Sequence, residues 1–216
     1  MLKDYAHNDI FILGTGTDVG KTYVSALLIN SLNKDGYNFG YFKPVVSGGM
    51  EDPIYVKEET GLPDSLESLV SYAFKPPLSP HLAAGDTVIS PKKIKENFLR
   101  LKEVQDERNL IIEGCGGIFC PIYIDNKNPS KNIFLKDIVK IFDCFKILVA
   151  PAGLGGLNSI FTALSYGKLN NIEIDILILN NFSKDSLICN DNLHFLKKYS
   201  GISEIFTVEN SQLQEK

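Results

Sequence analysis

The residues best suited to chemistry form one run near the start of the chain, Gly14-Thr-Gly-Thr-Asp-Val-Gly-Lys-Thr22. The run lies between the strand-like apolar segment 9–13 and the amphipathic, helix-like segment 21–33. In such a loop the backbone N–H groups point together at the helix N-terminus and bind phosphate. Lys21 would neutralise the β- and γ-phosphates, and the Thr22 hydroxyl would ligate Mg²⁺. The sequence therefore predicts a phosphate-binding loop, although the strict pattern has glycine where Thr15 stands.

One charged residue ends a predicted strand, a second follows another predicted strand, and a third lies in a polar loop. Glu113 ends an apolar strand and precedes Gly114-Cys-Gly-Gly117, where glycine lets the backbone approach a ligand closely. The carboxyl ends of parallel strands meet at one edge of a sheet, so Glu113 is predicted to face the phosphates and hold Mg²⁺. Lys43 follows the second predicted strand. Spacing alone leaves Lys43 open between a phosphate clamp and a surface lysine, and Asp52 between a metal ligand and a solvated residue.

Strand and helix patterns alternate along the chain, which implies parallel pairing, helices on both faces and right-handed crossovers. The predicted strands are 9–13, 39–42, 110–113, 146–150, 174–179 and 204–208. The predicted helices are 21–33, 52–60, 91–107, 134–142, 158–169 and 187–199. Residues 43–90 are the least regular stretch, with the second strand broken at Pro44 and an extended segment at 75–81. Asn158 or Ser159 is expected to cap its helix.

These elements predict one α/β domain over residues 1–216, doubly wound and mostly parallel, of the P-loop NTPase-like type. Apolar residues make up 44% of the chain and charged residues 22%, with a net charge of −4. The acidic balance argues against nucleic acid as a partner, and no apolar run approaches the roughly 20 residues that cross a membrane. The polar N-terminus lacks the apolar core of a signal peptide. We expect a cytoplasmic protein with four reduced cysteines, Cys115, Cys120, Cys144 and Cys189.

Five segments resemble those of the dethiobiotin synthases, in the order in which they occur in that family. The first is the phosphate loop, whose displaced glycine the family shares. The other four are Tyr41-Phe-Lys-Pro-Val-Val-Ser-Gly48, Leu78-Ser-Pro-His-Leu-Ala-Ala84, Ile112-Glu-Gly-Cys-Gly-Gly-Ile-Phe-Cys-Pro121 and Gly153-Leu-Gly-Gly-Leu-Asn158. The resemblance extends from residue 9 to about residue 181.

This resemblance implies an ATP-dependent ring closure in biotin synthesis. The family joins 7,8-diaminopelargonic acid and CO₂ into the cyclic urea of dethiobiotin, with release of ADP and phosphate. One substrate amine takes up CO₂ to give a carbamate, which ATP phosphorylates to a mixed anhydride. The neighbouring amine then attacks and displaces phosphate. The protein contributes positioning and charge neutralisation.

The resemblance also implies a role for each matching residue. Lys21 and Lys43 would be catalytic, Lys21 at the β- and γ-phosphates and Lys43 at the γ-phosphate and the carbamate. The implied Mg²⁺ ligands are Thr22, Asp52 and Glu113. The implied ATP-binding residues are Thr17, Asp18, Val19, Gly20, Lys21, Thr22, Glu113, Gly116 and Asn180. Asn180 would read the adenine edge.

The implied contacts to the diamine or its carbamate are Thr17, Asp18, Lys43 and Ser47. The substrate carboxylate would meet backbone N–H groups at a helix N-terminus, contributed by Gly155, Gly156, Leu157 and Asn158. In the family this turn comes from the partner subunit, so the resemblance implies a homodimer with its sites at the interface.

The chain departs from the family pattern at several positions. Asp18 replaces a glutamate and shortens a carboxylate that should approach the substrate. Ser159 stands where a histidine commonly follows the asparagine, and segment 201–210 lacks the proline-containing turn that frames the adenine. Cys115 stands where the family usually has alanine, so we expect it to act as a small side chain and not as a nucleophile.

Two other functions remain alternatives. A P-loop amidoligase of the cobyrinic-acid type would carry a long C-terminal glutaminase domain, and the sequence ending at Lys216 counts against it. A nucleotide-switch ATPase usually has a second lysine early in the loop. Here only Thr15, Gly16 and Thr17 stand between the first glycine and Asp18.

Overall fold

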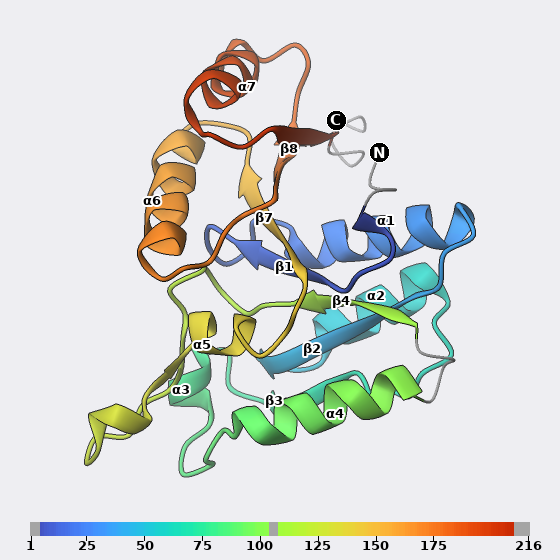
Figure 1. The fold of residues 1–216 in the computed structure, drawn as a ribbon, viewed down its shortest axis with the longest axis vertical. Coiled ribbons are helices and arrows are strands. Elements are labelled where there is room, and N and C mark those ends of the chain that lie inside the picture. Colours follow the sequence, from blue (N-terminus) through green and yellow to red (C-terminus); the bar gives the residue numbers. More distant parts are fainter. Residues whose placement is uncertain (1–4, 104–107, 210–216) are drawn as a thin grey trace.

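The computed structural model describes residues 5–103 and 108–209, which fold around a seven-stranded parallel sheet of order β3-β2-β4-β1-β7-β8-β9 (Figure 1). The alternation of strands and helices confirms the predicted doubly wound α/β class. Its strands are β1 (Ile10–Gly14), β2 (Phe39–Ser47), β3 (Val70–Phe74), β4 (Asn109–Glu113), β7 (Phe145–Pro151), β8 (Ile176–Phe182) and β9 (Glu204–Glu209).

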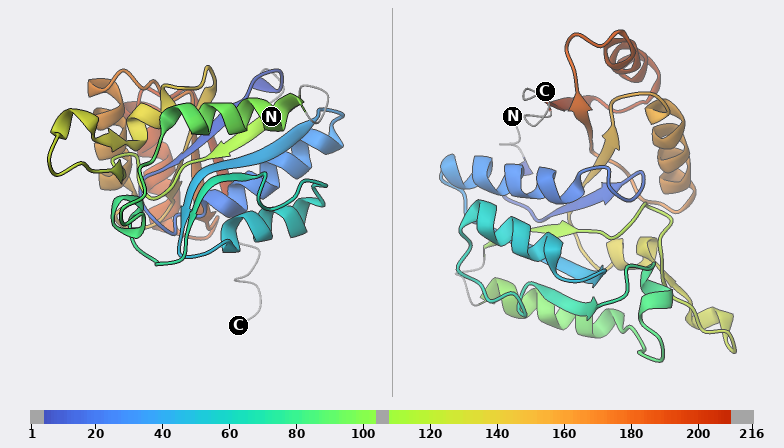
Figure 2. Two further views of the ribbon diagram at one scale, coloured as in Figure 1. Left: turned by 90° about the horizontal axis from the view of Figure 1, so that it is seen from below. Right: turned by 180° about the vertical axis from the view of Figure 1, so that it is seen from behind.

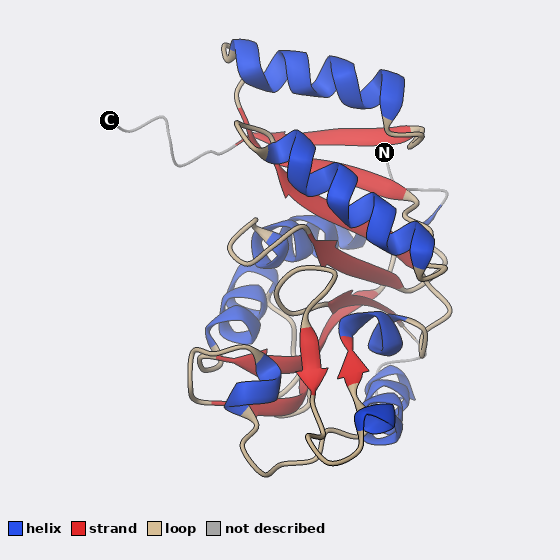
Figure 3. Cartoon of the chain, turned by 90° about the vertical axis from the view of Figure 1, so that its left-hand side faces the viewer, coloured by secondary structure: helices blue, strands red, loops and turns tan. Residues whose placement is uncertain are grey.

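Helices cover both faces of the sheet. Figure 2 shows α1 and α2 on one face, and α4 with α5 on the other. The helices are α1 (Lys21–Lys34), α2 (Glu51–Thr60), α3 (Pro80–Ala83), α4 (Pro91–Glu103), α5 (Leu135–Val139), α6 (Gly156–Leu169) and α7 (Leu187–Tyr199). Outside the main sheet, an antiparallel pair is formed by β5 (Pro121–Tyr123) and β6 (Ile133–Phe134), with the 3-10 turn η2 (Pro129–Lys131) between them (Figure 3). No helix in the described residues is long and apolar enough to cross a membrane.

The second strand continues past Pro44 to Ser47, so the predicted break at the proline is wrong. Pairing with β4 ends at Phe42, and the next N–H, that of Lys43, donates to the Leu69 carbonyl on the opposite side at 2.8 Å. Because N–H groups along a strand alternate in direction, the Pro44 nitrogen faces the side where pairing has ended. Proline costs a strand little at such a position. One continuous strand therefore presents both Lys43 and Ser47.

The irregular stretch 43–90 contains two elements that the sequence did not predict. Strand β3 adds an edge to the sheet, with Val70 and Tyr72 buried and Ala73 exposed. Its short apolar pattern is obscured by the polar and proline-rich residues around it. Helix α3 begins at Pro80, inside the segment expected to be extended. Proline fits the first helical position because that position needs no N–H donor.

Helix α6 begins at Gly156, and its N-cap is Gly155 where the sequence predicted Asn158 or Ser159. Gly155 has φ 83°, in the left-handed region that favours glycine. The Ser159 hydroxyl donates to the Gly156 carbonyl at 2.9 Å and so does not cap the helix start. The glycine turn therefore takes the place of a side-chain cap.

Phe142 lies beyond the end of α5, although the sequence predicted a helix through it. Its ring centroid lies 4.8 Å from that of Phe98 on α4 and 6.5 Å from that of Phe42 on β2. These aromatic contacts hold α4 and the segment after α5 against the same face of the sheet. The predicted last turn of the helix 91–107 falls on residues 104–107, outside the described part of the chain.

The central strands are almost wholly apolar and buried, as expected for a parallel sheet with both faces covered. Two buried polar side chains stand where these strands end. Glu113 ends β4, and Asn180 lies near the end of β8. Gly14 ends β1. Because these strands are parallel, all three positions lie at the same edge of the sheet, where ligands bind in this type of fold.

Candidate active site

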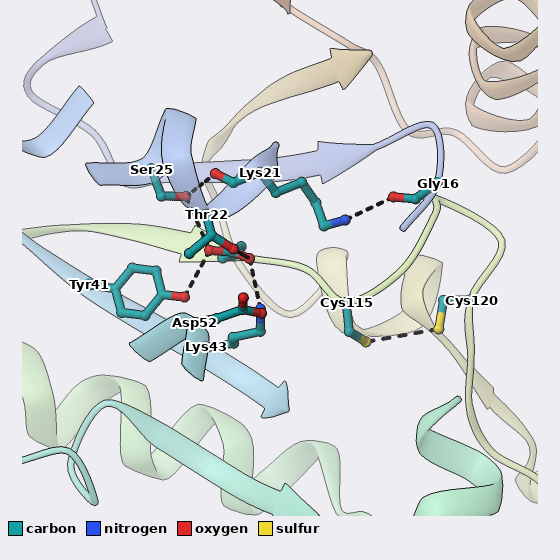
Figure 4. Close-up of polar contacts among 10 residues, drawn as sticks. Gly16, Lys21, Thr22, Ser25, Tyr41, Lys43, Asp52, Cys115 and Cys120 are labelled. Atoms are coloured by element: carbon teal, nitrogen blue, oxygen red, sulfur yellow. Dashed lines mark hydrogen bonds and ion pairs between the residues drawn. The ribbon is translucent and has the colours of Figure 1, made fainter. Parts of the chain in front are cut away.

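The loop between β1 and α1 turns sharply around the N-terminus of α1. Asp18 and Gly20 both have left-handed backbone conformations, with φ of 57° and 92°. A Cβ on Gly20 would come within 1.9 Å of Asn180 Nδ2, so only glycine fits there. The Lys21 ammonium donates to the Gly16 carbonyl at 2.9 Å, which folds the side chain back over the loop (Figure 4). This arrangement suits a bound phosphate chain.

Glu113 is fully buried and accepts four side-chain hydrogen bonds. Thr22 Oγ1 and Lys43 Nζ donate to Oε1 at 2.9 and 2.7 Å. The Tyr41 hydroxyl and Ser25 Oγ donate to Oε2 at 2.8 and 3.4 Å. Burying a carboxylate costs far less when it is paired and hydrogen-bonded in this way. Glu113 is therefore held rigidly beside the phosphate loop.

Lys43 bridges two carboxylates. Its side chain is 4% exposed, and its ammonium forms ion pairs with Glu113 and with Asp52, whose side chain is 44% exposed (Figure 4). Burial alone would lower the pKa of Lys43, but the two carboxylates outweigh it and raise this pKa above its usual value. Burial likewise opposes ionisation of Asp52, yet Lys43 holds the pKa of Asp52 below its usual value. The group therefore presents a charged lysine at neutral pH.

Lys21 lies in a different electrostatic environment. Burial lowers the pKa of its ammonium, Lys43 lowers it further, and Glu113 acts in the opposite direction. The net shift is downward. A nearby anion such as a phosphate would therefore stabilise the charged form of Lys21.

Sequence reasoning missed two members of this site, Tyr41 and Ser25. The spacing of each from a predicted site residue could have identified it. Tyr41 is two residues before Lys43 on β2, so strand alternation places both on one face. Ser25 follows Lys21 by one helical turn on α1 and so faces the same side.

We expect Tyr41→Phe to destabilise the protein by about 1.5–3 kcal/mol, since it removes a hydrogen bond to a buried charged group. Phenylalanine fills the same space, and the other three donors keep Glu113 in place. Urea unfolding of both proteins measures the change. Tyr123→Phe, on β5 and outside the site, is the matched control and should change stability by less than about 0.5 kcal/mol. An equal free energy of unfolding for Tyr41→Phe and the wild type would contradict the importance of this contact.

Asn180 carries a buried acceptor without a partner. Its Nδ2 donates to the Val19 carbonyl at 3.1 Å, whereas Oδ1 has no hydrogen-bond partner. Buried polar atoms are nearly always hydrogen-bonded, so an N–H group of a ligand is expected there. The amino group of adenine is a donor of this kind. Val19 contributes its backbone carbonyl to this arrangement.

A cleft of about 990 Å³ brings together most of the predicted site residues. They come from the loop before α1, from α1 itself and α2, from the middle and end of β2, from the ends of β4 and β8, and from the turn after β4. The predicted residues that line it are Thr17, Asp18, Gly20, Lys21, Thr22, Lys43, Ser47, Asp52, Glu113, Gly116 and Asn180. Val46, Tyr55 and segment 77–80 form much of the remaining wall. The cleft is at the upper end of the volumes usual for ligand sites, about 300–1,000 Å³.

Four predicted substrate-binding residues do not line this cleft. They form the turn into α6 and its first residues, Gly155, Gly156, Leu157 and Asn158. The turn follows β7 and carries the side chain of Leu154, which is 89% exposed. Within one chain these residues are therefore not brought together with the phosphate loop.

Comparisons with known proteins find a matching family model and similar proteins with names. A family model described as an AAA domain matches residues 8–215. A protein of Clostridium perfringens named ATP-dependent dethiobiotin synthetase BioD is 39% identical over 210 residues, covering 92% of this chain and 89% of that protein. A protein of the same name from Brachyspira hyodysenteriae is 38% identical over 202 residues, covering 91% and 89%.

Solved structures share the fold at low sequence identity. The MinC:MinD cell division protein complex of Aquifex aeolicus contains a chain with a TM-score of 0.56 and 15% identity, covering 95% of this chain and 83% of that one. A putative plasmid partition protein of Borrelia burgdorferi bound to AMPPNP has a TM-score of 0.54 and 16% identity, covering 97% and 90%. At this identity the likeness concerns the fold alone.

Proposed function

Because this chain belongs to the ATP-dependent dethiobiotin synthetase family, we propose that it forms the cyclic urea of dethiobiotin from 7,8-diaminopelargonic acid, CO₂ and ATP. It is thus an ATP-dependent ligase of biotin synthesis that releases ADP and phosphate. One observation supports this function above the others. The charged Lys43 lies in the same cleft as the phosphate loop and faces it from a different strand.

The two lysines neutralise different parts of the reaction. The backbone N–H groups of the loop and Lys21 bind the β- and γ-phosphates. Lys43 faces the γ-phosphate and the carbamate together. A carbamate oxygen attacks the γ-phosphorus, and the bond from phosphorus to the ADP oxygen breaks. Two anions must approach each other in this step, so a fixed cation between them lowers the barrier.

Ring closure follows within the same cleft. The second amine of the substrate attacks the carbonyl carbon of the mixed anhydride, forms a C–N bond and loses a proton. The C–O bond to the phosphate breaks, and phosphate leaves. Thr17, Asp18 and Ser47 bind the diamine or its carbamate. Holding the second amine next to the carbonyl favours this intramolecular attack over hydrolysis.

The donor set formed by the first turns of α1 and α2 and the end of β4 fits Mg²⁺. Thr22, Asp52 and Glu113 supply a hydroxyl and two carboxylates, and Mg²⁺ in ATP enzymes is commonly bound by one or two carboxylates together with substrate phosphates. When bound, the ion would neutralise phosphate charge. Asn180 meets the adenine through its free Oδ1.

The substrate carboxylate needs a further binding site, and we assign it to the turn Gly155–Asn158 of a partner subunit. The turn lies outside the cleft of its own chain, which supports a contribution in trans. The N-terminus of a long helix carries partial positive charge and N–H donors suited to a carboxylate. The working enzyme is then a homodimer, and free thiols at all four cysteines support a cytoplasmic location.

ATP turnover measured with and without the diamine and bicarbonate tests this function. We expect ADP release only when both are present, because the carbamate is the phosphoryl acceptor. Equal ADP release without them would favour a nucleotide switch and contradict the proposal.

A further inference from the structure

Two thiols face each other at the wall of the cleft. Cys115 Sγ lies 3.9 Å from Cys120 Sγ, and both side chains are half-buried and line the cleft (Figure 4). The two other cysteines, Cys144 and Cys189, are buried elsewhere in the fold. Only the first pair therefore combines mutual proximity with access from the cleft among the described residues.

The segment between the two thiols is attached to the phosphate loop. The Ile118 N–H donates to the Gly14 carbonyl at 3.0 Å. Gly117 packs so closely that a Cβ there would lie 3.1 Å from the Thr15 carbonyl oxygen. Gly116 has φ 59°, which gives the segment a tight turn. A change in the conformation of this segment is therefore transmitted directly to the backbone that binds phosphate.

We propose that Cys115 and Cys120 are a redox modification site, where a peroxide converts the thiol pair to an intrachain disulfide. One thiol attacks a peroxide oxygen, the O–O bond breaks, and a sulfenic acid and water form. The second thiol attacks the sulfenic sulfur, an S–S bond forms, and the S–O bond breaks with loss of a second water. The two sulfurs lose two electrons in total, and the peroxide gains them. Disulfides inside cells are usually transient in this way.

Oxidation should weaken ATP binding. This effect on ATP binding rests on the proposed function, whereas formation of the disulfide does not. The sulfurs must approach from 3.9 Å to a bond length of about 2.05 Å, and the intervening residues must adjust. Those residues contact Gly14 and Thr15. We expect ATP affinity to fall about tenfold on oxidation, within the range usual for coupling between two sites.

Thiol mapping tests the modification directly. The full chain is treated with hydrogen peroxide, alkylated under denaturing conditions, digested with trypsin and analysed by mass spectrometry. We expect the peptide 109–127, which carries both thiols, to lose two hydrogens and resist alkylation until a reductant is added. Cys144 and Cys189 should remain alkylatable. Cys115→Ala and Cys120→Ser should each prevent the loss. A peptide that stays fully alkylatable, or a sulfinic acid on one cysteine, would overturn the proposal.

The redox potential of the thiol pair, measured with and without ATP, tests the coupling between disulfide formation and ATP binding. The wild type is equilibrated in glutathione redox buffers with and without saturating ATP. Binding is reciprocal, so a tenfold effect on affinity makes the disulfide easier to reduce by about 30 mV when ATP is present. Equal potentials would overturn the coupling. Failure of the reduced protein to bind ATP would contradict the proposed function, and thiol mapping would still decide the modification.

Discussion

Replacing Lys43 by alanine is expected to abolish ring closure and to destabilise the fold. Turnover should fall at least about 10²–10³-fold, the loss usual when one fixed group that stabilises developing charge is removed. Lys43 is also the cation that pairs with Glu113 inside the protein. Removing one partner of a buried pair costs about 3 kcal/mol or more. For a chain of this size that lowers Tm by roughly 6–12 °C.

This expectation differs from the one that the sequence supports. From the sequence alone, Lys43→Ala would lose activity and keep its fold. Because Lys43 and Glu113 are both buried, the substitution is also expected to lower the stability of the fold. Calorimetry and steady-state kinetics on the same preparation measure both effects.

A double variant separates the two roles of Lys43. Lys43→Ala combined with Glu113→Gln removes the unpaired buried charge, so it should recover much of the lost Tm while turnover stays absent. Lys43→Arg keeps the charge and should retain most of the stability. Near-normal turnover of Lys43→Ala would refute its catalytic role. An unchanged Tm would refute the buried pairing.

Replacing Lys21 by alanine is expected to abolish turnover without loss of stability. The Lys21 ammonium donates to a carbonyl, that of Gly16, and the Glu113 carboxylate keeps its own four donors. No buried charge is left unpaired, so the free energy of unfolding should change by less than about 1 kcal/mol. The kcat/KM for ATP should fall about 10²–10³-fold, because the phosphates lose a fixed cation.

Titration of ATP into Lys21→Ala, followed by its steady-state kinetics, checks this result. Lys34, on the last turn of the same helix, provides the control: Lys34→Ala should bind and turn over ATP as the wild type does. Wild-type kcat/KM for ATP in Lys21→Ala would mean that the phosphates bind elsewhere.

Much of the site could be predicted because its residues stand where regular elements begin and end. The loop before Thr22 and the carboxylate of Glu113 are of this kind. Parallel topology brings such positions together without any knowledge of side-chain contacts. Lys43 and Asp52 could not be resolved from spacing, because their roles depend on an ion pair that forms only in the folded chain.

The differences between the predicted and the observed elements have local physical causes. Proline is read as a strand breaker, but Pro44 lies where no N–H is needed. Asn and Ser are typical N-cap residues, so Asn158 or Ser159 is the predicted cap of α6. The N-cap is instead Gly155, in a glycine turn. The Cys115–Cys120 pair has five-residue spacing, which indicates nothing by itself. Their proximity depends on the turn at Gly116.

The most direct test of the proposed reaction is a product assay with isotope-labelled bicarbonate. The purified protein is incubated with the diamine, ATP, Mg²⁺ and labelled bicarbonate, and the products are analysed by mass spectrometry. We predict dethiobiotin carrying the label at its urea carbon, in amounts equal to the ADP released, and none with Lys43→Ala. ADP release without labelled dethiobiotin would contradict the proposed function.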